Sequence, residues 1–571
     1  MKKLFVNIAV WTGVCLSVGS CHDLDLNPLS SGSTENWYST TTEIQMAVNK
    51  MYNSTYWRPE GDNQTDWSDD AVYRESLTEF ENATINSENW IVGLYWRTGF
   101  QMVSYANSVI NKYQRALDKG ANQAEVMSYV GEAKFFRGVA YGRLISRFGD
   151  VPYITEEVDV EAGLKVGRTD KNEILKHVYA DLDSAIRLLP VSYAGNQRAT
   201  KGAALAFKAR IALYMGDYRV AAEAAKKVID LGVYALEPSY RELFLQKTKT
   251  SKEFIFILPR SISMGIDILS SNTVKNRMVR NAGGWAATDP SWDLLAAYTC
   301  TDGLPIDESP LFDSHNPFKN RDPRCSETLV PFNEPFLGYI YSPSPADVEV
   351  LNVNTGKKEY NNDTRINKQY ASFNGLAWKK GIDESWMDNG YTAENPQIVM
   401  RYADVLLMYA EAKIELGEID QSVIDAMNIV RARAYGVDKA NVSSYPAFTI
   451  LPQKDMRKQL RMERRMELAG ENLRFSDLMR WRLSEVVMNK KQYGMLYPAT
   501  ECLEKVVNAG HWFWPSTPDI DENGCADFTK LENTGLIQVL SQRRWDDRQY
   551  LWPIPAKEIQ INGNMTQNKD Y

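Results

Sequence analysis

The sequence is poor in the residues that most often hold metal ions. It has four histidines and six cysteines among 571 residues, and no Cys-x-x-Cys pair occurs. The histidines, His22, His177, His315 and His511, have no second histidine or cysteine at ligand spacing. Because protein zinc sites gather several such ligands, we expect no zinc site and no cofactor.

Long basic runs and familiar catalytic motifs are also missing. The formal net charge is −8, and acids and bases are interspersed along the chain. Because binding to nucleic-acid phosphates depends on clustered Lys and Arg, a nucleic-acid partner is disfavoured. The sequence has no Gly-x-Ser-x-Gly elbow, phosphate loop or His-Glu-x-x-His helix. It therefore shows no recognisable catalytic centre.

No apolar run is long enough for a membrane span, and the clearest one begins the chain. A basic start at Lys2 and Lys3 precedes mostly apolar residues 4–18. This order is typical of an export signal, and the apolar part is shorter than the roughly 20 residues that span a bilayer. Small residues then lead to Cys21, which resembles the cysteine of a bacterial lipobox, lipidated as the first residue of the mature chain.

We therefore predict a signal peptide over residues 1–20, lipidation of Cys21 and a flexible polar tether over residues 21–40. An ordinary signal peptide followed by a chance cysteine is the alternative. Export also makes disulfides possible. The pairings Cys300–Cys325 and Cys502–Cys525 are candidates that the sequence does not decide.

Most of the chain beyond the tether has the helical period. Apolar residues recur at that period from Val126 to Phe148 and from Ile174 to Leu189. The spacing of Ala209, Gly216-Asp217 and Ala225 is repeated by Ala410, Gly417-Glu418 and Ala426. Small residues at these offsets let antiparallel helices approach across a tight turn, as in tetratricopeptide-like hairpins. Two unrelated amphipathic hairpins are the alternative.

We accordingly predict a mostly α-helical fold of tetratricopeptide-like hairpins, with an irregular, loop-rich insertion that carries a few short strands. The predicted regions are 41–231, helical; 232–400, loop-rich and ligand-binding; and 401–571, helical. The middle region is richer in Gly, Pro, Asn and aromatic residues. Loops on a rigid scaffold often carry function.

Several segments together resemble the SusD/RagB family of outer-membrane nutrient-binding lipoproteins of the Bacteroidetes. They keep the family order and extend over residues 131–568, and the lipobox also fits. The matching segments are 131–137, 148–152, 198–204, 283–285, 321–324, 401–412, 463–468, 474–481 and 553–555.

The resemblance implies a mostly α-helical fold with four tetratricopeptide-like hairpins. It also implies a lipid-anchored position on the outer membrane, facing the extracellular side, and a partnership with a SusC-like TonB-dependent transporter barrel. The implied ligand is an oligosaccharide or polysaccharide that is bound without cleavage. The family motifs mark the framework, so they do not identify the residues that contact the ligand.

Three carboxylates, Glu463, Glu467 and Glu471, follow one another at four-residue spacing and share a face if one helix holds them. Paired carboxylates could hydrolyse a glycosidic bond. Arginines surround them in the sequence, however, and we interpret the group as a packed charge network. The arginines are Arg461, Arg464, Arg465, Arg474 and Arg480.

Aromatic residues indicate where a glycan would bind. Sugar rings pack an apolar face on flat aromatic rings while their hydroxyls seek polar side chains. Residues 56–96 and 283–391 combine both kinds of side chain. From them we predict Trp67, Trp90, Trp285, Trp378 and Trp386 as partly exposed platforms, with Tyr73, Arg74 and Asn89 as hydrogen-bonding or rim residues.

The alternating oxygen side chains of Asp62, Gln64, Asp66, Ser68 and Asp70 are reminiscent of a calcium loop. An EF-hand also needs a glycine at its sixth position and a glutamate at its twelfth, and Trp67 and Tyr73 stand there. We therefore expect a solvated acidic loop and no metal.

Three hypotheses follow. The first is a surface glycan-binding lipoprotein without catalysis, which delivers its ligand to a transporter. The second is a surface glycoside hydrolase or lyase that uses a carboxylate pair. The third is a helical scaffold that binds only protein.

Overall fold

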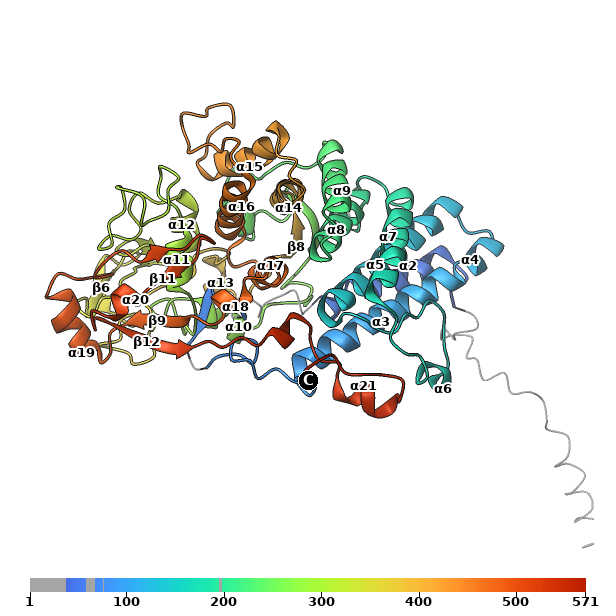
Figure 1. Cartoon of the computed structure of the whole chain (residues 1–571), viewed down its shortest axis with the longest axis horizontal. Helices are drawn as coiled ribbons and strands as arrows, with labels where there is room; N and C mark the ends of the chain where they lie inside the picture. The colour runs from blue at the N-terminus through green and yellow to red at the C-terminus, as the bar shows by residue number, and fades with distance from the viewer. Residues whose placement is uncertain (1–36, 58–66, 75, 195–197) are drawn as a thin grey trace, which may run out of the picture.

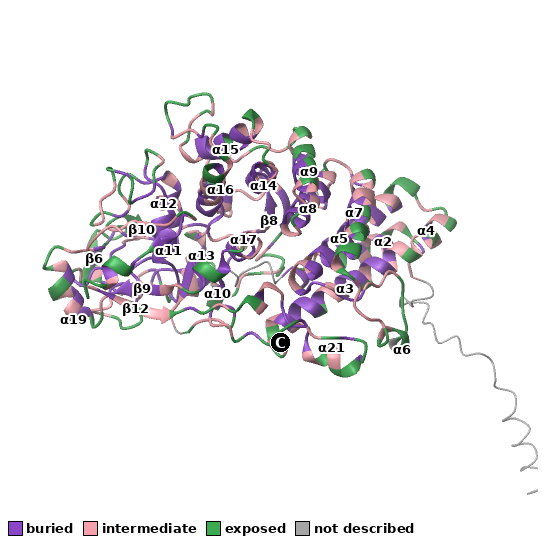
Figure 2. Ribbon diagram, viewed as in Figure 1, coloured by how far each residue is buried: buried purple, intermediate pink, exposed green. Residues whose placement is uncertain are grey.

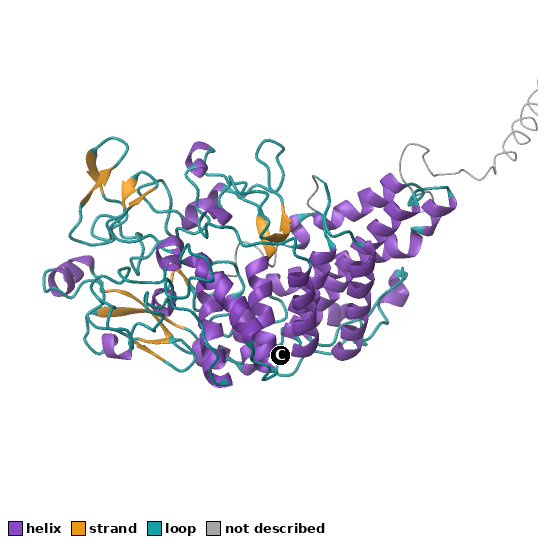
Figure 3. Ribbon diagram, turned by 90° about the horizontal axis from the view of Figure 1, so that it is seen from above, coloured by secondary structure: helices purple, strands orange, loops and turns teal. Residues whose placement is uncertain are grey.

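The computed structural model describes residues 37–57, 67–74, 76–194 and 198–571. The predicted signal peptide, Cys21 and the tether up to residue 36 lie outside these residues. Long helices form one half of the elongated molecule, and most strands and loops form the other (Figure 1, Figure 3). The predicted mostly α-helical fold is confirmed. No helix in the described ranges is long and apolar enough to cross a membrane.

The helical half is a row of helices in which neighbours in space are mostly neighbours in the chain. In this row α5 packs between α3 and α7, α8 packs on α7 and α9, and α14 packs on α9, α15 and α16. The helices are α2 (Thr41–Asn49), α3 (Trp90–Lys112), α4 (Gln114–Asp118), α5 (Gln123–Phe148), α6 (Val160–Gly163), α7 (Lys171–Leu188), α8 (Lys201–Tyr214), α9 (Tyr218–Asp230), α14 (Tyr402–Glu415), α15 (Gln421–Ala434) and α16 (Gln453–Leu468).

The repeated spacing found in the sequence corresponds to two helical hairpins, α8–α9 and α14–α15. Gly216 and Gly417 follow the first helix of each pair with φ angles of +77° and +73°, a conformation that favours glycine. The small residues Ala209 and Ala410 are buried where the helices meet. The predicted hairpins are therefore confirmed.

The loop-rich half contains short helices and small antiparallel sheets, in which β1 pairs with β3, β2 with β8, β9 with β12 and β10 with β11. The short helices are α10 (Ser271–Arg277), α11 (Trp292–Ala297), α12 (Pro323–Thr328), α13 (Ser385–Asp388), α17 (Arg474–Trp481), α18 (Ser484–Val487), α19 (Ala499–Cys502) and α20 (Thr529–Glu532). The last short helix, α21 (Ala556–Ile561), lies beside α3 of the helical half (Figure 1). The strands are β1 (Ala71–Tyr73), β2 (Phe254–Leu258), β3 (Thr288–Pro290), β4 (Pro335–Phe336), β5 (Tyr339–Ile340), β6 (Glu349–Asn352), β7 (Lys357–Tyr360), β8 (Gln397–Arg401), β9 (Lys491–Met495), β10 (Asp519–Ile520), β11 (Ala526–Asp527) and β12 (Ile537–Gln542).

Each half has its own hydrophobic core. One cluster runs through α2–α9 and α14–α16, and a second lies among α11, α12, β9 and the loops around them. Buried residues therefore follow the long helices of the helical half and the centre of the loop-rich half (Figure 2). Cys300, Cys325, Cys502 and Cys525 are buried as free thiols. The two candidate disulfides are thus not formed in this structure.

Buried ion pairs connect the two halves. Arg401, at the end of β8, lies 2.7 Å from both Glu253 and Glu467 and 2.6 Å from Glu471. Arg324 of α12 lies 2.8 Å from Glu463 and 3.0 Å from Glu467. The interpretation of these glutamates as a packed charge network is confirmed.

Two details of that interpretation were wrong. Helix α16 ends at Leu468, so Glu471 does not share a helix with the other two glutamates. The cations that bind the three glutamates come from distant segments, while nearby arginines bind aspartates and Glu411. The distant cations are Arg324, Lys380, Arg401, Arg431 and Arg433.

Close packing of α5 on α8 gives a stability prediction. A Cβ atom at Gly142 would lie 2.4 Å from the Cδ1 atom of Ile211. We expect Gly142→Ala to lower the free energy of unfolding by about 1 to 3 kcal/mol, the usual cost of overpacking. Denaturant unfolding followed by circular dichroism measures the change.

The matched control is Gly93→Ala in α3, where an added Cβ would meet no atom within 4 Å. Because alanine favours helix more than glycine, this variant should be neutral or more stable by up to about 1 kcal/mol. Equal unfolding midpoints for the two variants would contradict the packing described here.

Candidate functional site

A sharply folded loop presents Trp285 at the surface of the loop-rich half. The Trp285 N–H donates to the Lys275 carbonyl at 2.6 Å, and the Ala286 N–H donates to the Met278 carbonyl at 3.0 Å. At Gly284 a Cβ atom would lie 2.1 Å from that same Met278 carbonyl oxygen, so only glycine fits. The loop is thus held against α10 and leaves 37% of the Trp285 side chain exposed.

Two arginines brace this loop from the other side. Arg74 donates through Nη1 to the carbonyls of Trp285 at 2.6 Å and Tyr370 at 2.8 Å. Arg280 donates through its own Nη1 to the same two carbonyls, at 2.8 Å and 3.3 Å. Backbone oxygens of two distant segments are therefore joined by a pair of guanidinium groups.

The braced segments form an open aromatic surface. The Tyr370 side chain is 53% exposed, and the Arg74 guanidinium lies 5.5 Å from its ring centroid. Half-buried Tyr73 precedes Arg74 and pairs with Thr288 in the β1–β3 sheet. We call the exposed side chains of Trp285 and Tyr370, with Arg74 and Arg280, the Trp285 platform.

A pair of buried carboxyl groups lies behind the platform. Asp363 accepts the backbone N–H groups of Arg280 at 2.6 Å and Asn281 at 3.2 Å. Burial raises the pKa of Asp363 to about 6 and that of Asp289, in β3, to about 7. One carboxyl oxygen of Asp289 has no hydrogen-bond partner among the described residues.

Three of the predicted platform residues are buried, so the expectation of exposure was wrong for them. Trp67 is 4% exposed, Trp378 is fully buried and Trp386 is 4% exposed. The polar neighbours that suggested exposure are themselves buried in ion pairs or hydrogen bonds: Asp69 and Asp70 pair with arginines, Lys380 pairs with Glu471, and Asn395 accepts from the Trp386 indole.

Trp67 packs against Phe80, with 4.2 Å between the ring centroids, inside the helical core. The expected solvated acidic loop is likewise wrong for Ser68 and Asp70, which are buried. Asp62, Gln64 and Asp66 lie outside the described residues. In the described part of the chain, no group of three or more His, Cys, Asp or Glu side chains could hold a metal ion.

Asn89 and Trp90 lie at a different place, at the start of α3. The Asn89 side chain caps this helix by accepting the N–H groups of Ile91 at 2.9 Å and Val92 at 3.3 Å. Trp90 is 62% exposed and borders a groove of about 1090 Å³ between α3 and α21. The structure therefore joins Tyr73, Arg74 and Trp285 in one site and places Asn89 and Trp90 along a separate groove.

Sequence reasoning missed Arg280 and Tyr370. Arg280 lies three residues before the Gly283-Gly284 pair, and Tyr370 lies in a polar stretch rich in turns. Tyr370 lies in the stretch 283–391, and Arg280 lies just before it. The mixture of aromatic and polar side chains that indicated the other candidates could therefore have indicated these two as well. Their proximity, however, depends on contacts across 90 residues of chain.

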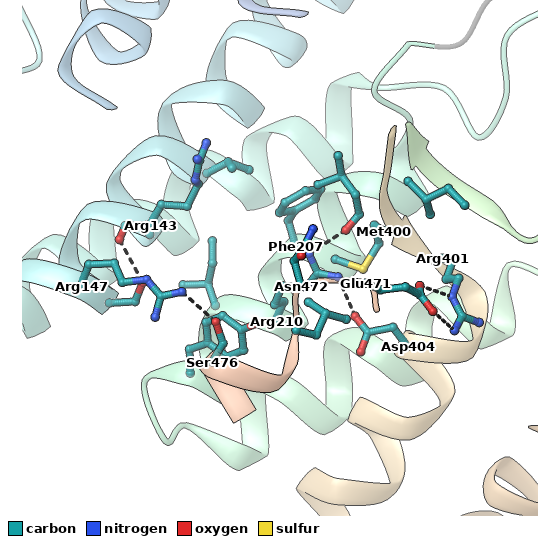
Figure 4. A pocket seen from close by; sticks show the side chains of 18 of the residues that line it. Arg143, Arg147, Phe207, Arg210, Met400, Arg401, Asp404, Glu471, Asn472 and Ser476 are labelled. Atoms are coloured by element: carbon teal, nitrogen blue, oxygen red, sulfur yellow. Dashed lines mark hydrogen bonds and ion pairs between the residues drawn. The ribbon is translucent and has the colours of Figure 1, made fainter. Parts of the chain in front are cut away.

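An internal cavity lies where the two halves meet (Figure 4). Arg143 and Arg147 reach it from α5, Arg210 from α8 and Asp404 from α14, and Arg210 binds Asp404 at 2.6 Å. The cavity holds about 60 Å³, which is room for a few water molecules and not for a sugar chain.

Asp404, which lines this cavity, and Glu467, which binds the lining residue Arg401, are both strongly acidic. Burial alone would raise the pKa of Glu467, but Arg433, Arg401 and Arg324 outweigh it and lower the pKa to about 2. Arg210 and Arg464 likewise outweigh burial at Asp404 and lower its pKa to about 2. Such groups stay ionised at neutral pH and have no proton to donate to a leaving group.

Two family models match the chain. The one described as SusD family matches residues 261–571, more than half of the chain, and the one described as "Starch-binding associating with outer membrane" matches residues 24–213. The chain belongs to the SusD family. The resemblance found in the sequence motifs is thus confirmed.

Relatives and solved structures agree with this membership. SusD-like protein P2 of Formosa agariphila is 27% identical over 515 residues, which cover 85% of this chain and 92% of that protein. A SusD-like carbohydrate-binding protein from Bacteroides fragilis is 25% identical with a TM-score of 0.73, over 93% of this chain and 99% of that chain. A laminarin-binding SusD-like protein shares the fold at 21% identity and a TM-score of 0.59, over 94% and 100% of the two chains.

The Trp285 platform of this SusD-family protein is built partly on the family motif Gly283-Gly284-Trp285. Two glycines of that motif have a local role: Gly284 allows the contact with Met278, and Gly283 leaves room for the Tyr391 hydroxyl. Arg74 and Tyr370 lie outside the motifs that identified the family.

The raised pKa of Asp289 gives a prediction for stability against pH. Its folded value of about 7 exceeds the ordinary 3.8, so the folded state binds an extra proton between these values. The contribution of this proton to the free energy of unfolding is fully present below about pH 4 and is lost as the pH rises through 7. It amounts to up to about 4 kcal/mol, at about 1.4 kcal/mol per pKa unit.

We expect Asp289→Asn to remove this contribution. The difference in unfolding free energy between the variant and the unaltered protein should shift in favour of the variant from pH 4 to pH 8. Replacing the exposed Asp118 by Asn is the control and should give a flat difference. A flat difference for Asp289→Asn would contradict the raised pKa.

Proposed function

We propose that this SusD-family protein binds glycans on the Trp285 platform without cleaving them. The observation that carries the proposal is the exposed pair of aromatic rings, Trp285 and Tyr370, held in place by Arg74 and Arg280. Flat exposed rings suit the apolar faces of sugars, and the neighbouring guanidinium groups can donate to hydroxyls. The names of relatives as carbohydrate-binding, laminarin-binding and surface glycan-binding proteins support it.

The groove beside Trp90 is a second candidate surface for the same ligand class. Among the described residues, the Trp90 indole has no aromatic partner and no hydrogen bond, and it is 62% exposed, which distinguishes it from the buried tryptophans. Asn89 contributes there by capping α3, which fixes the position of Trp90.

The same proposal extends to location and partner. The family model associated with the outer membrane supports a place at that membrane. We propose that Cys21 carries the lipid anchor, that the protein faces the extracellular side, and that it delivers glycan to a TonB-dependent transporter. A helical surface alone could also bind only protein, and glycan-binding assays separate that hypothesis from ours.

The hydrolase hypothesis is less well supported. Asp404 and Glu471 line a cavity too small for a sugar, Glu467 is buried behind it, and the lowered pKa values of all three do not suit a general acid. Asp289 and Asp363 have raised pKa values but are buried. Incubation with a glycan panel and assay of new reducing ends tests the point, and sustained release would favour the hydrolase.

Replacing Trp285 by Ala should weaken glycan binding about 10-fold or more, because burying an aromatic face contributes on the order of 1.5 kcal/mol or more. Affinity electrophoresis and calorimetry against a glycan panel measure the change. The Trp90→Ala variant is the matched comparison. Loss only in Trp90→Ala would move the site to the α3 groove, and unchanged binding in both would reject both surfaces.

Replacing Cys21 by Ala should separate location from binding. A protein without its lipid should leave the membrane fraction of cells, because acyl chains anchor a protein by hydrophobic burial. The purified variant should bind glycan with unchanged affinity. Continued partition into washed membranes would contradict lipidation at Cys21.

A further inference from the structure

Three cationic side chains surround Trp285 without a carboxylate partner. They are Arg74, Arg280 and Lys275, and none of them forms an ion pair with a described residue. The chain as a whole carries a net charge of −8. By contrast, buried arginines at the junction of the halves, such as Arg324 and Arg401, each contact several carboxylates.

The two guanidinium groups are forced close together. Both Nη1 atoms donate to the same Trp285 and Tyr370 carbonyl oxygens, so like charges share their acceptors. Burial and the neighbouring Arg74 lower the pKa of Arg280. The Nη2 groups of both arginines are unburied and have no hydrogen-bond partner among the described residues. Donors and charge are therefore left available at the edge of the aromatic platform.

The third cation extends this surface toward Tyr391. The Lys275 ammonium lies 4.3 Å from the Tyr391 ring centroid, and the Lys275 carbonyl accepts the Trp285 N–H. The Tyr391 hydroxyl fits beside Gly283, where a Cβ atom would lie only 2.1 Å away. The loop that carries Trp285 is thus flanked by two guanidinium groups at its backbone and by the Lys275 ammonium and the Tyr391 ring beside Gly283.

The two buried carboxyl groups behind the platform, Asp363 and Asp289, raise the pKa of Arg280 by less than burial and Arg74 lower it, so they offset its environment only in part. Asp363 uses its oxygens to accept two backbone N–H groups, and neither Asp363 nor Asp289 forms an ion pair with a described cation. Asp289 is also partly protonated near neutral pH.

We propose that the ligand of the Trp285 platform is an acidic glycan, whose carboxylate or sulfate group binds the Nη2 groups of Arg74 and Arg280 while a sugar ring packs on Trp285. This inference rests on the proposed function and adds the charge class of the glycan. Charge-assisted hydrogen bonds to guanidinium are about twice as strong as neutral ones. A negatively charged group would also relieve the repulsion between the two arginines.

The test compares matched pairs of oligosaccharides that differ only in charge. One pair is an oligogalacturonate and its methyl ester, and the other is a sulfated carrageenan oligosaccharide and its desulfated form. We expect at least one acidic member to bind the unaltered protein on the order of 10-fold more tightly than its neutral form. The difference should shrink as salt is raised from 0.05 to about 0.5 M, because salt screens exposed charges.

Variants then locate the effect. Lys275→Gln and Arg280→Gln should reduce the preference for the acidic member, and Arg187→Gln, which removes an exposed arginine of α7, is the control and should not. Thermal unfolding and tryptophan fluorescence report whether Arg280→Gln keeps the loop in place. Should that variant misfold, Lys275→Gln and the salt series still decide.

The outcomes separate the two proposals. Equal or tighter binding of both neutral members would overturn the acidic-glycan inference and leave glycan binding intact. Preference that persists in Lys275→Gln and disappears in Arg187→Gln would also overturn it. Failure of every oligosaccharide to bind would reject glycan binding at this site and the inference with it. Preference for one pair alone identifies carboxylate or sulfate as the recognised group.

Discussion

The fold depends on the pairing of buried charges around α16. Glu463 and Glu467 project from this helix and meet Arg324 of α12, Arg401 of β8 and Arg431 and Arg433 of α15. Leaving one of these buried charges without its partner costs several kcal/mol. The packing of each segment on α16 therefore depends on the packing of the others. Three separated parts of the sequence, α12, β8 and α15, are thereby fixed relative to one helix.

The same network positions the Trp285 platform. Arg465 and Arg474, on α16 and α17, bind Asp70 and Asp69 at 2.8 Å. The backbone carbonyl of Asp70 accepts the Ser291 N–H at 3.0 Å, and β1 follows immediately and pairs with β3. Strand β3 begins three residues after Trp285. The position of this tryptophan therefore depends, through the β1–β3 pairing, on the buried Asp69 and Asp70 that directly precede β1.

This arrangement explains which features could be predicted from the sequence. Helical period and the Gly216 and Gly417 turns are local, so the hairpins followed from short-range rules. The exposure of the tryptophans could not be predicted, because the charged residues near them are buried through distant partners. Asp70 and Asp69 pair with arginines 395 and 405 residues away, and Lys380 pairs with Glu471, 91 residues away. The glutamate partners were misassigned for the same reason, since sequence neighbours such as Arg464 and Arg465 bind aspartates instead.

The way in which the platform is braced also separates framework from ligand contact. Arg74 and Arg280 bind the backbone carbonyls of residues 285 and 370, not their side chains. A different side chain at either position would leave those hydrogen bonds in place, whereas a side chain at position 284 would collide with the Met278 carbonyl. Gly284 and the two arginines thus fix the backbone of the loop, and the displayed rings add no contact that the loop needs to keep its shape. The family-like segment 283–285 therefore supplies both the glycine that fixes the loop and the tryptophan that the loop displays, whereas its braces, Arg74 and Arg280, come from outside that segment.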